Sequence, residues 1–270
     1  MVTECQGVNQ ELSEVLNQLW SRDTNRLKPG TDYTISLQAG YVAQGSNTAR
    51  DMARAPLFTY VNEGKLKSIK TYALFMRLLD NYEMSTGVSE TVTSEELMEN
   101  DLFLNAILET EVMKVVCDLS LSVPTGISGG YSLLVFAWLS TYSYVLSSFR
   151  SIDSCGFEHV FVGESKYGKE ITGFHNWVQF YLQEKLGNVD YKGYKVKNLS
   201  FDLSVQPDED DHVLNLQFSW KGLVKPVGSS FIGVSPEFEV ALFTILFLAS
   251  TGKVSDCVSD HTRFKPGSIR

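Results

Sequence analysis

The chain contains the stretch Gly156-Phe157-Glu158-His159-Val160-Phe161-Val162-Gly163-Glu164, followed by Gly173-Phe174-His175-Asn176-Trp177. This short region holds two of the four histidines in the sequence. The ordinary pKa of histidine lies between about pH 5 and 8, so a pair can supply a neutral base and a charged acid at the same time. The pair therefore indicates proton transfer, with the alternative that His159 is a core residue and His175 a surface residue at the start of a helix.

The segment around the first histidine is rich in valine and phenylalanine, which is typical of a strand. In a strand, His159 would share one face with Phe157 and Phe161. Glu158 and Glu164 would lie on the opposite face, so we do not expect a direct pair between His159 and a carboxylate. We interpret the two glutamates as groups that orient their neighbours or contribute to a metal site, with exposed carboxylates at the strand ends as the alternative.

The second histidine stands beside an apolar stripe of helical spacing, formed by Phe174, Trp177, Val178, Tyr181 and Leu182. The stripe predicts a helix over residues 174–185, with His175 in its first turn. The positive end of the helix dipole disfavours a charged imidazole there, so we expect His175 to be neutral and suited to act as a general base.

Along the whole chain, the hydrophobic pattern changes from helical spacing in the first half to strand-like spacing in the second. It predicts helices over residues 9–20, 69–82 and 236–250, and one that runs from a cap at Ser94 toward Cys117. It predicts strands over residues 159–163, 194–203 and 213–221. We therefore predict an α+β fold in a single domain over residues 1–270, with approximate lobes at 1–150 (helix-rich) and 151–270 (strand-rich).

The predicted strand over residues 213–221 alternates strictly, with Leu214, Leu216, Phe218 and Trp220 pointing inward and Asn215, Gln217, Ser219 and Lys221 on the polar face. Lys221, at the strand end, is either a solvated lysine or a group that stabilises negative charge on phosphoryl oxygens. The acidic run at residues 208–211 is interpreted as a solvated turn between two strands, with cation binding as the alternative.

The composition is that of a folded protein with an acidic balance. A net charge of −9 argues against a nonspecific nucleic-acid coat, because binding to the phosphate backbone needs an excess of Lys and Arg. A catalytic RNA site needs only local positive charge. No CxxC pair is present, so a zinc knuckle is not indicated and we expect free thiols at Cys5, Cys117, Cys155 and Cys257.

The first residues carry neither the basic nor the apolar region of a signal peptide, and we expect a cytoplasmic or nuclear protein. Two apolar stretches, at residues 131–146 and 240–249, are shorter than the roughly 20 residues of a spanning helix. We interpret both as core helices and expect no membrane partner.

Several long motifs resemble the EndoU family of poly(U)-specific endoribonucleases. Besides the two histidine segments, they include Val189-Asp190-Tyr191-Lys192-Gly193-Tyr194, Lys225-Pro226-Val227-Gly228-Ser229-Ser230-Phe231-Ile232-Gly233-Val234-Ser235-Pro236-Glu237-Phe238-Glu239, and residues 19–27 and 79–82. The resemblance spans most of the chain. It implies a two-lobed α+β fold in which an antiparallel sheet carries the active site.

The resemblance also implies an activity: cleavage of single-stranded, uridine-containing RNA at uridylates, leaving 2′,3′-cyclic phosphate ends. The enzyme is expected to depend on Mn²⁺, with Ca²⁺ possible, although the metal ligands are not identified. Carried over residue by residue, the catalytic set is His159, His175 and Lys221, with supporting or metal-linked roles for Glu158 and Glu164.

We expect His175 to be the base toward the ribose 2′-hydroxyl, His159 the acid toward the 5′-oxygen, and Lys221 the group that holds the phosphoryl oxygens. Uridine preference is expected to depend on Gly228, Ser229 and Ser230, with a tight turn before Phe231 as the alternative. The metal ion, bound by Glu158, Glu164 or residues 208–211, is expected to assist RNA binding rather than to activate water.

Two segments depart from the family pattern. Residues 115–117 read Val-Val-Cys where members tend to carry a histidine, and residues 259–270 replace the strands with which members continue. The alternative function is therefore a catalytically impaired EndoU-like RNA-binding protein. A metal-dependent phosphodiesterase is a third reading, but the histidines lack an H-x-H or H-x-x-x-H spacing. We expect a monomer.

Overall fold

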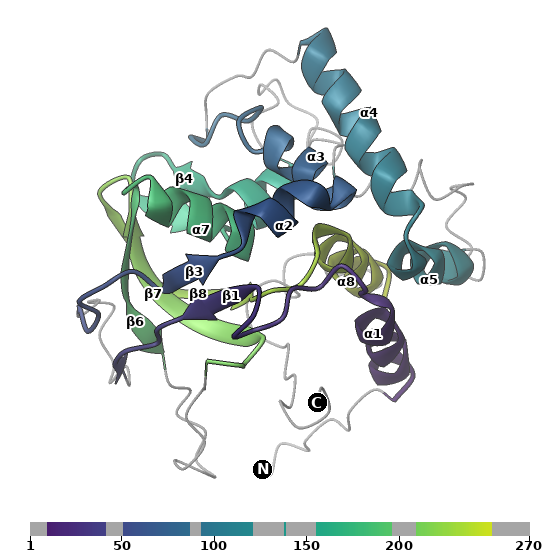
Figure 1. The fold of residues 1–270 in the computed structure, drawn as a ribbon. Helices are drawn as coiled ribbons and strands as arrows, with labels where there is room; N and C mark the ends of the chain where they lie inside the picture. The colour runs from purple at the N-terminus through teal and green to yellow at the C-terminus, as the bar shows by residue number, and fades with distance from the viewer. Residues whose placement is uncertain are drawn as a thin grey trace, which may run out of the picture.

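The computed structural model describes residues 10–41, 51–86, 93–120, 138, 155–195 and 209–249. Figure 1 shows that the helices α1, α5 and α8 lie together beside a twisted sheet that includes β6, β7 and β8. The described residues combine helices with antiparallel strands, which confirms the predicted α+β class.

The helices are α1 (Gln10–Arg22), α2 (Glu63–Ser68), α3 (Lys70–Leu78), α4 (Ser94–Leu108), α5 (Glu111–Ser120), α7 (Trp177–Lys185) and α8 (Pro236–Ala249). The predicted helices near the N-terminus, over residues 69–82 and after Ser235 are confirmed as α1, α3 and α8. The single helix predicted from Ser94 toward Cys117 is wrong, because it is two helices, α4 and α5.

Threonine hydroxyls explain where these two helices begin. Thr93, one residue before the predicted cap, accepts a hydrogen bond from the Glu96 backbone at 3.2 Å, and the Glu96 carboxylate accepts one from the Thr93 backbone at 2.6 Å. Thr110 separates α4 from α5, since its hydroxyl donates to the Ile107 carbonyl at 2.6 Å and accepts from the Met113 backbone at 3.3 Å. A hydroxyl that bonds the backbone locally ends one helix and caps the next.

The main sheet has the order β2-β6-β7-β8, with β2 (Gly40–Tyr41), β6 (Val189–Lys195), β7 (Val213–Trp220) and β8 (Leu223–Phe231). Its last three strands are antiparallel, and β2 runs parallel to β6. Two small antiparallel pairs join β1 (Tyr33–Ile35) to β3 (Phe58–Val61) and β4 (Glu164–Lys166) to β5 (Glu170–Thr172).

The strand predicted over residues 213–221 is confirmed as β7. Its inward residues Leu214, Leu216, Phe218 and Trp220 are each 1% exposed. Gln217 departs from the predicted polar face, because it lies opposite a bulge in β6 and is buried there.

The strand predicted over 194–203 overlaps β6 only at Tyr194 and Lys195, and its remainder lies outside the described residues. Glu209 and Asp210 form an exposed turn before β7 as predicted, while residue 208 lies outside the described part.

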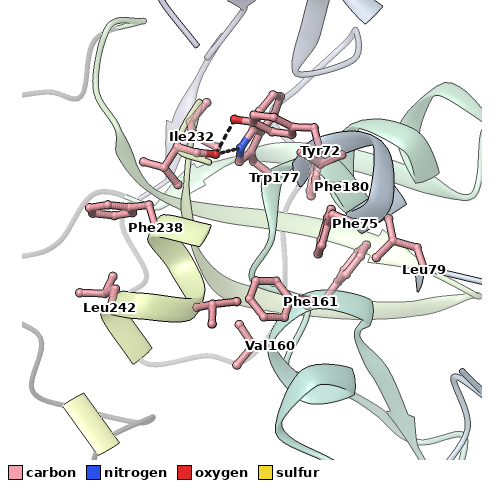
Figure 2. Packing of buried hydrophobic residues seen from close by; sticks show 14 of the residues in the cluster. Tyr72, Phe75, Leu79, Val160, Phe161, Trp177, Phe180, Ile232, Phe238 and Leu242 are labelled. Atoms are coloured by element: carbon pink, nitrogen blue, oxygen red, sulfur yellow. Dashed lines mark hydrogen bonds between the residues drawn. The ribbon is translucent and has the colours of Figure 1, made fainter. Parts of the chain in front are cut away.

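One hydrophobic core joins elements from both halves of the sequence. Figure 2 shows Tyr72 of α3 next to Trp177 of α7, and both side chains are fully buried. The Tyr72 hydroxyl and the Trp177 indole N–H each donate to the Val234 carbonyl at 2.8 Å. These bonds hold the start of α7 against the segment that precedes α8.

The apolar stretch at residues 240–249 lies in α8, which packs against α1, α3 and α5. Of the stretch at 131–146 only Trp138 is described, and its indole N–H donates to Thr244 of α8 at 2.8 Å. Within the described ranges, no helix is both long and apolar enough to cross a bilayer.

Candidate active site

The first histidine does not lie in a strand, so that prediction is wrong. Residues Glu158–Val162 form one turn of π-helix, which ends at Gly163, where φ is 86°. The Gly163 N–H donates to the Glu158 carbonyl at 2.8 Å, and this bond closes the wide turn. A short apolar run buried on several sides has no period that distinguishes a helix from a strand.

The helical turn reverses the predicted relation between His159 and Glu164. The Nδ1 atom of His159 lies 3.2 Å from Oε2 of Glu164, at the first residue of β4. The Glu164 side chain is 4% exposed, whereas the His159 side chain is 33% exposed. A buried carboxylate on Nδ1 orients the imidazole and leaves Nε2 free of this contact.

Glu158 is buried on the same turn and lies next to Cys155. Burial raises the pKa of the Cys155 thiol well above its ordinary value, and the Glu158 charge raises it further. Cys117 and Cys155 are free thiols, as predicted, and Cys5 and Cys257 lie outside the described residues.

The second histidine precedes its helix rather than lying in the first turn. The helix α7 begins at Trp177, and the Asn176 side chain caps it by accepting a hydrogen bond from the Gln179 backbone at 2.9 Å. Phe174 has a φ of 62°, a left-handed conformation that turns the chain before the cap. His175 is therefore held in a loop by tertiary contacts.

Those contacts come from the π-helical turn and from β8. The His175 N–H donates to the Val160 carbonyl at 2.8 Å, and the Ser230 hydroxyl donates to the His175 carbonyl. In the ring, Nδ1 lies 2.7 Å from the Ser229 carbonyl. Because a carbonyl only accepts, Nδ1 must carry a proton, and in the neutral ring the free lone pair then lies on Nε2.

The surroundings of His175 favour the neutral ring. Burial lowers its pKa to about 3, with further lowering by the charges of Lys225 and His159, while the bond to the Ser229 carbonyl acts in the opposite direction. The predicted neutral imidazole therefore agrees with the structure, although burial and a lysine produce it rather than a helix dipole. A neutral ring with a free Nε2 can accept a proton.

The two imidazole rings lie close together, with their centroids 6.0 Å apart. Gly173 permits this approach: a Cβ built on it would lie 1.7 Å from the His159 carbonyl oxygen, and its φ is 61°. The Phe174 N–H also donates to that carbonyl at 2.9 Å. The two imidazoles, one on a carboxylate and the other on a backbone carbonyl, are therefore close enough to face one small group.

Lys221 is not brought to the histidines. It forms the β7–β8 turn with Gly222, both with positive φ (51° and 75°), and is exposed beside the Trp220 ring. The Ser229 carbonyl that holds His175 lies opposite Asn215 in β7, six residues from this turn, which is roughly 20 Å along a strand. The structure does not support the predicted role of Lys221 at the phosphate.

Lys225 occupies the place that Lys221 was expected to fill. It is 8% exposed on β8, and its ammonium donates to the carbonyl of Gly173, two residues before His175. Burial lowers its pKa to about 8, so it remains mainly charged at pH 7. The sequence carried no periodic signal for this role, because Leu223–Phe231 does not alternate between apolar and polar residues.

The residues Gly228, Ser229 and Ser230 lie within β8, opposite Leu216, Asn215 and Leu214, so the alternative of a tight turn is wrong. The Ser229 hydroxyl is exposed and donates to the Asn215 side chain at 2.8 Å. Ser230 is buried, and its hydroxyl donates to the His175 carbonyl. The two serines therefore have different roles available to them.

Metal ligands do not gather in the described part of the chain, where no three His, Cys, Asp or Glu side chains are grouped to hold an ion. Glu164 is engaged by His159, and Glu209 and Asp210 lie in the exposed turn before β7. Among the residues that the structure describes, none fit a dedicated Mn²⁺ or Ca²⁺ site, and no chemical step is assigned to an ion.

Comparisons with known proteins agree on one family. Residues 11–267 match the family model described as Endoribonuclease XendoU. The chain is 58% identical to poly(U)-specific endoribonuclease-B of Xenopus laevis, covering 92% of this chain and 85% of that protein. It is 56% identical to uridylate-specific endoribonuclease C of Danio rerio, with coverages of 94% and 81%.

A solved structure gives the same result. The chain resembles the structure reported as XendoU, a splicing-independent snoRNA-processing endoribonuclease, with a TM-score of 0.76 and 55% identity over 92% of this chain and 87% of that one. The family model and these relatives confirm the resemblance stated from the sequence. The chain belongs to the XendoU (EndoU) family of endoribonucleases and is an RNA-cleaving enzyme.

Proposed function

We propose that the protein cleaves single-stranded RNA at uridylates by transesterification through the ribose 2′-hydroxyl, leaving a 2′,3′-cyclic phosphate. The observation that carries the mechanism is the histidine pair, with ring centroids 6.0 Å apart and opposite environments on the two Nδ1 atoms. The names of the relatives, poly(U)-specific and uridylate-specific endoribonuclease, support the choice of uridylate.

In this mechanism Nε2 of neutral His175 takes the proton of the 2′-hydroxyl while its oxygen attacks phosphorus. The bond between phosphorus and the 5′-oxygen breaks, and protonated His159 delivers its proton to that leaving oxygen. Lys225 faces the charge that develops on the non-bridging oxygens, because it is the buried cation next to His175. Glu164 keeps the His159 ring oriented and stabilises its charge.

Base selection is assigned to the exposed face of β8. Discrimination of uridine from cytidine needs fixed donors and acceptors, since the two bases differ in one hydrogen-bonding edge. The Ser229 hydroxyl is exposed and lies on the residue whose carbonyl holds His175, so a base placed at the active site can meet it. Ser230 supports His175 through the backbone and is assigned to positioning.

Manganese, with calcium as an alternative, is assigned to RNA binding, where it neutralises phosphates without occupying a dedicated protein site. We further propose that the protein acts as a monomer in the cytoplasm or nucleus. Sedimentation at several concentrations tests the first, and fluorescence microscopy of the tagged chain tests the second.

The decisive experiment uses an oligodeoxynucleotide with one ribouridine, with and without Mn²⁺, and analyses the product ends. We expect a single cut after the ribouridine, a 2′,3′-cyclic phosphate, and no cut when the uridine is also 2′-deoxy. Omission of Mn²⁺ should raise KM more than it lowers the single-turnover rate. Efficient cutting of the fully deoxy strand would refute the mechanism, and binding without cleavage would favour the impaired RNA-binding alternative.

A further inference from the structure

The β4–β5 hairpin projects from the active site. Its first strand begins at Glu164, which bonds His159, and its second strand ends at Thr172, next to the Gly173 carbonyl that binds Lys225. The strand β5 also packs against β8. Both ends of the hairpin are thus fixed to catalytic groups, and three residues per strand place its tip about 10 Å away.

The outer edge of the hairpin is hydrogen-bonded to a segment from the first half of the chain. The Ser165 N–H donates to the Met84 carbonyl at 2.8 Å, and the Thr86 N–H donates to the Ser165 carbonyl at 3.2 Å. The Tyr167 N–H donates to the Thr86 hydroxyl at 3.2 Å. These bonds connect the tip of the hairpin to Met84 and Thr86.

The tip carries an exposed aromatic ring between two lysines. Tyr167 is 62% exposed and has a φ of 49°, a left-handed conformation that is costly for a bulky residue. Lys166 and Lys169 are both exposed. Glu170 lies 3.5 Å from Lys166, but both side chains are more than half exposed, so solvent weakens this pair.

We propose that this tip is a second RNA subsite, in which Tyr167 stacks on a base outside the two nucleotides joined by the cleaved phosphate while Lys166 and Lys169 contact neighbouring phosphates. The inference rests on the proposed function. An aromatic ring flanked by cations is the combination that binds single strands without base preference.

The test compares two substrates: the dinucleotide UpA, which is too short to reach the tip, and an eight-nucleotide strand with one central uridine. Tyr167→Ala is expected to lower kcat/KM on the longer strand by about tenfold and to leave UpA unchanged. Tyr167→Phe keeps the stacking ring and should behave as the wild type. Tyr60→Ala is the matched control, because Tyr60 is an exposed tyrosine on β3, outside the hairpin.

A binding measurement separates this inference from the proposed function. The eight-nucleotide strand with 2′-deoxyuridine should bind Tyr167→Ala about tenfold more weakly than the wild type, whether or not the enzyme cuts RNA. The Lys166→Ala/Lys169→Ala variant should show a shallower dependence of binding on salt. Equal losses on UpA and the longer strand, or unchanged binding in Tyr167→Ala, would overturn the subsite, whereas failure of the wild type to cut would refute only the proposed function.

Discussion

The two histidine segments of the active site place the same side chain in opposite environments. His159 lies in a π-helical turn with a buried carboxylate on Nδ1, while His175 lies in a loop with a backbone carbonyl on Nδ1 and a lysine nearby. A carboxylate stabilises the charged ring, whereas burial and a cation favour the neutral ring. The environment of each ring thus comes from its neighbours, and for His175 the neighbouring carbonyl lies 54 residues away in the sequence.

The two lysines of the β7–β8 hairpin also differ in their surroundings. Lys221 is exposed in the turn, and Lys225 is buried beside the Gly173 carbonyl. They are four residues apart, yet the register of the hairpin brings only Lys225 to the site.

Replacing either histidine by alanine is expected to cause the largest loss, at least about 100-fold in single-turnover rate. The two variants should separate on an RNA in which sulfur replaces the 5′-oxygen at the cut, because a thiolate leaves without being protonated. His159→Ala should recover most of its rate on this substrate, and His175→Ala should not. Recovery of His175→Ala alone, or of both variants equally, would contradict the assignment of acid and base.

Replacing Lys225 is expected to cause the next largest loss in cleavage rate. Lys225→Ala is expected to lower the cleavage rate by about 100-fold or more, because one preorganised charge at a developing oxyanion is lost. Lys221→Ala is the matched control and should keep the wild-type rate. Rates are measured at saturating RNA, with melting temperatures to verify folding, and a larger loss in Lys221→Ala would return the catalytic role to the hairpin turn.

The contact between the Glu164 carboxylate and His159 can be tested separately. Glu164→Gln keeps the side-chain shape but removes the charge, so we expect about a tenfold loss in kcat with little change in KM. Since Glu164 acts through His159, the loss should disappear on the RNA with the 5′-sulfur leaving group. A loss that persists on that substrate would show that Glu164 serves the fold or the base instead.

The two serines on β8 should separate specificity from positioning. Ser229→Ala is expected to lower the ratio of cutting after U to cutting after C by a few-fold, since its hydroxyl is exposed. Ser230→Ala is expected to lower the rate for both bases equally, because its hydroxyl holds the His175 carbonyl. Parallel assays on strands with one U or one C give both ratios, and an unchanged ratio in Ser229→Ala would move specificity elsewhere.

The neutral state of His175 also affects how stability depends on pH. The pKa of His175 is about 3 in the folded protein and about 6.5 when unfolded, so between these values the unfolded chain binds more protons. Its contribution to the free energy of unfolding should therefore fall as the pH is lowered from 6.5 toward 3. Urea titrations should show a flatter dependence in His175→Gln than in the wild type, and an unchanged slope would mean that His175 is not held neutral.

The elements with a clear apolar period were predictable from the sequence. Helix α1 and strand β7 each repeat one apolar pattern over many residues, so their faces and approximate ends follow from local chemistry. The helix break at Thr110 and the π-helical turn at His159 were not predicted. The first depends on one hydroxyl, and the second on a short run that is buried on several sides.

The family, the α+β class and the histidine pair were readable from the sequence, because those signals are carried by residue types in local order. Which carboxylate contacts His159, why His175 is neutral, and that Lys225 rather than Lys221 lies at the site all depend on the folded chain. These relations depend on strand register, burial and chain reversals. Such quantities join residues far apart in sequence, and no local pattern encodes them.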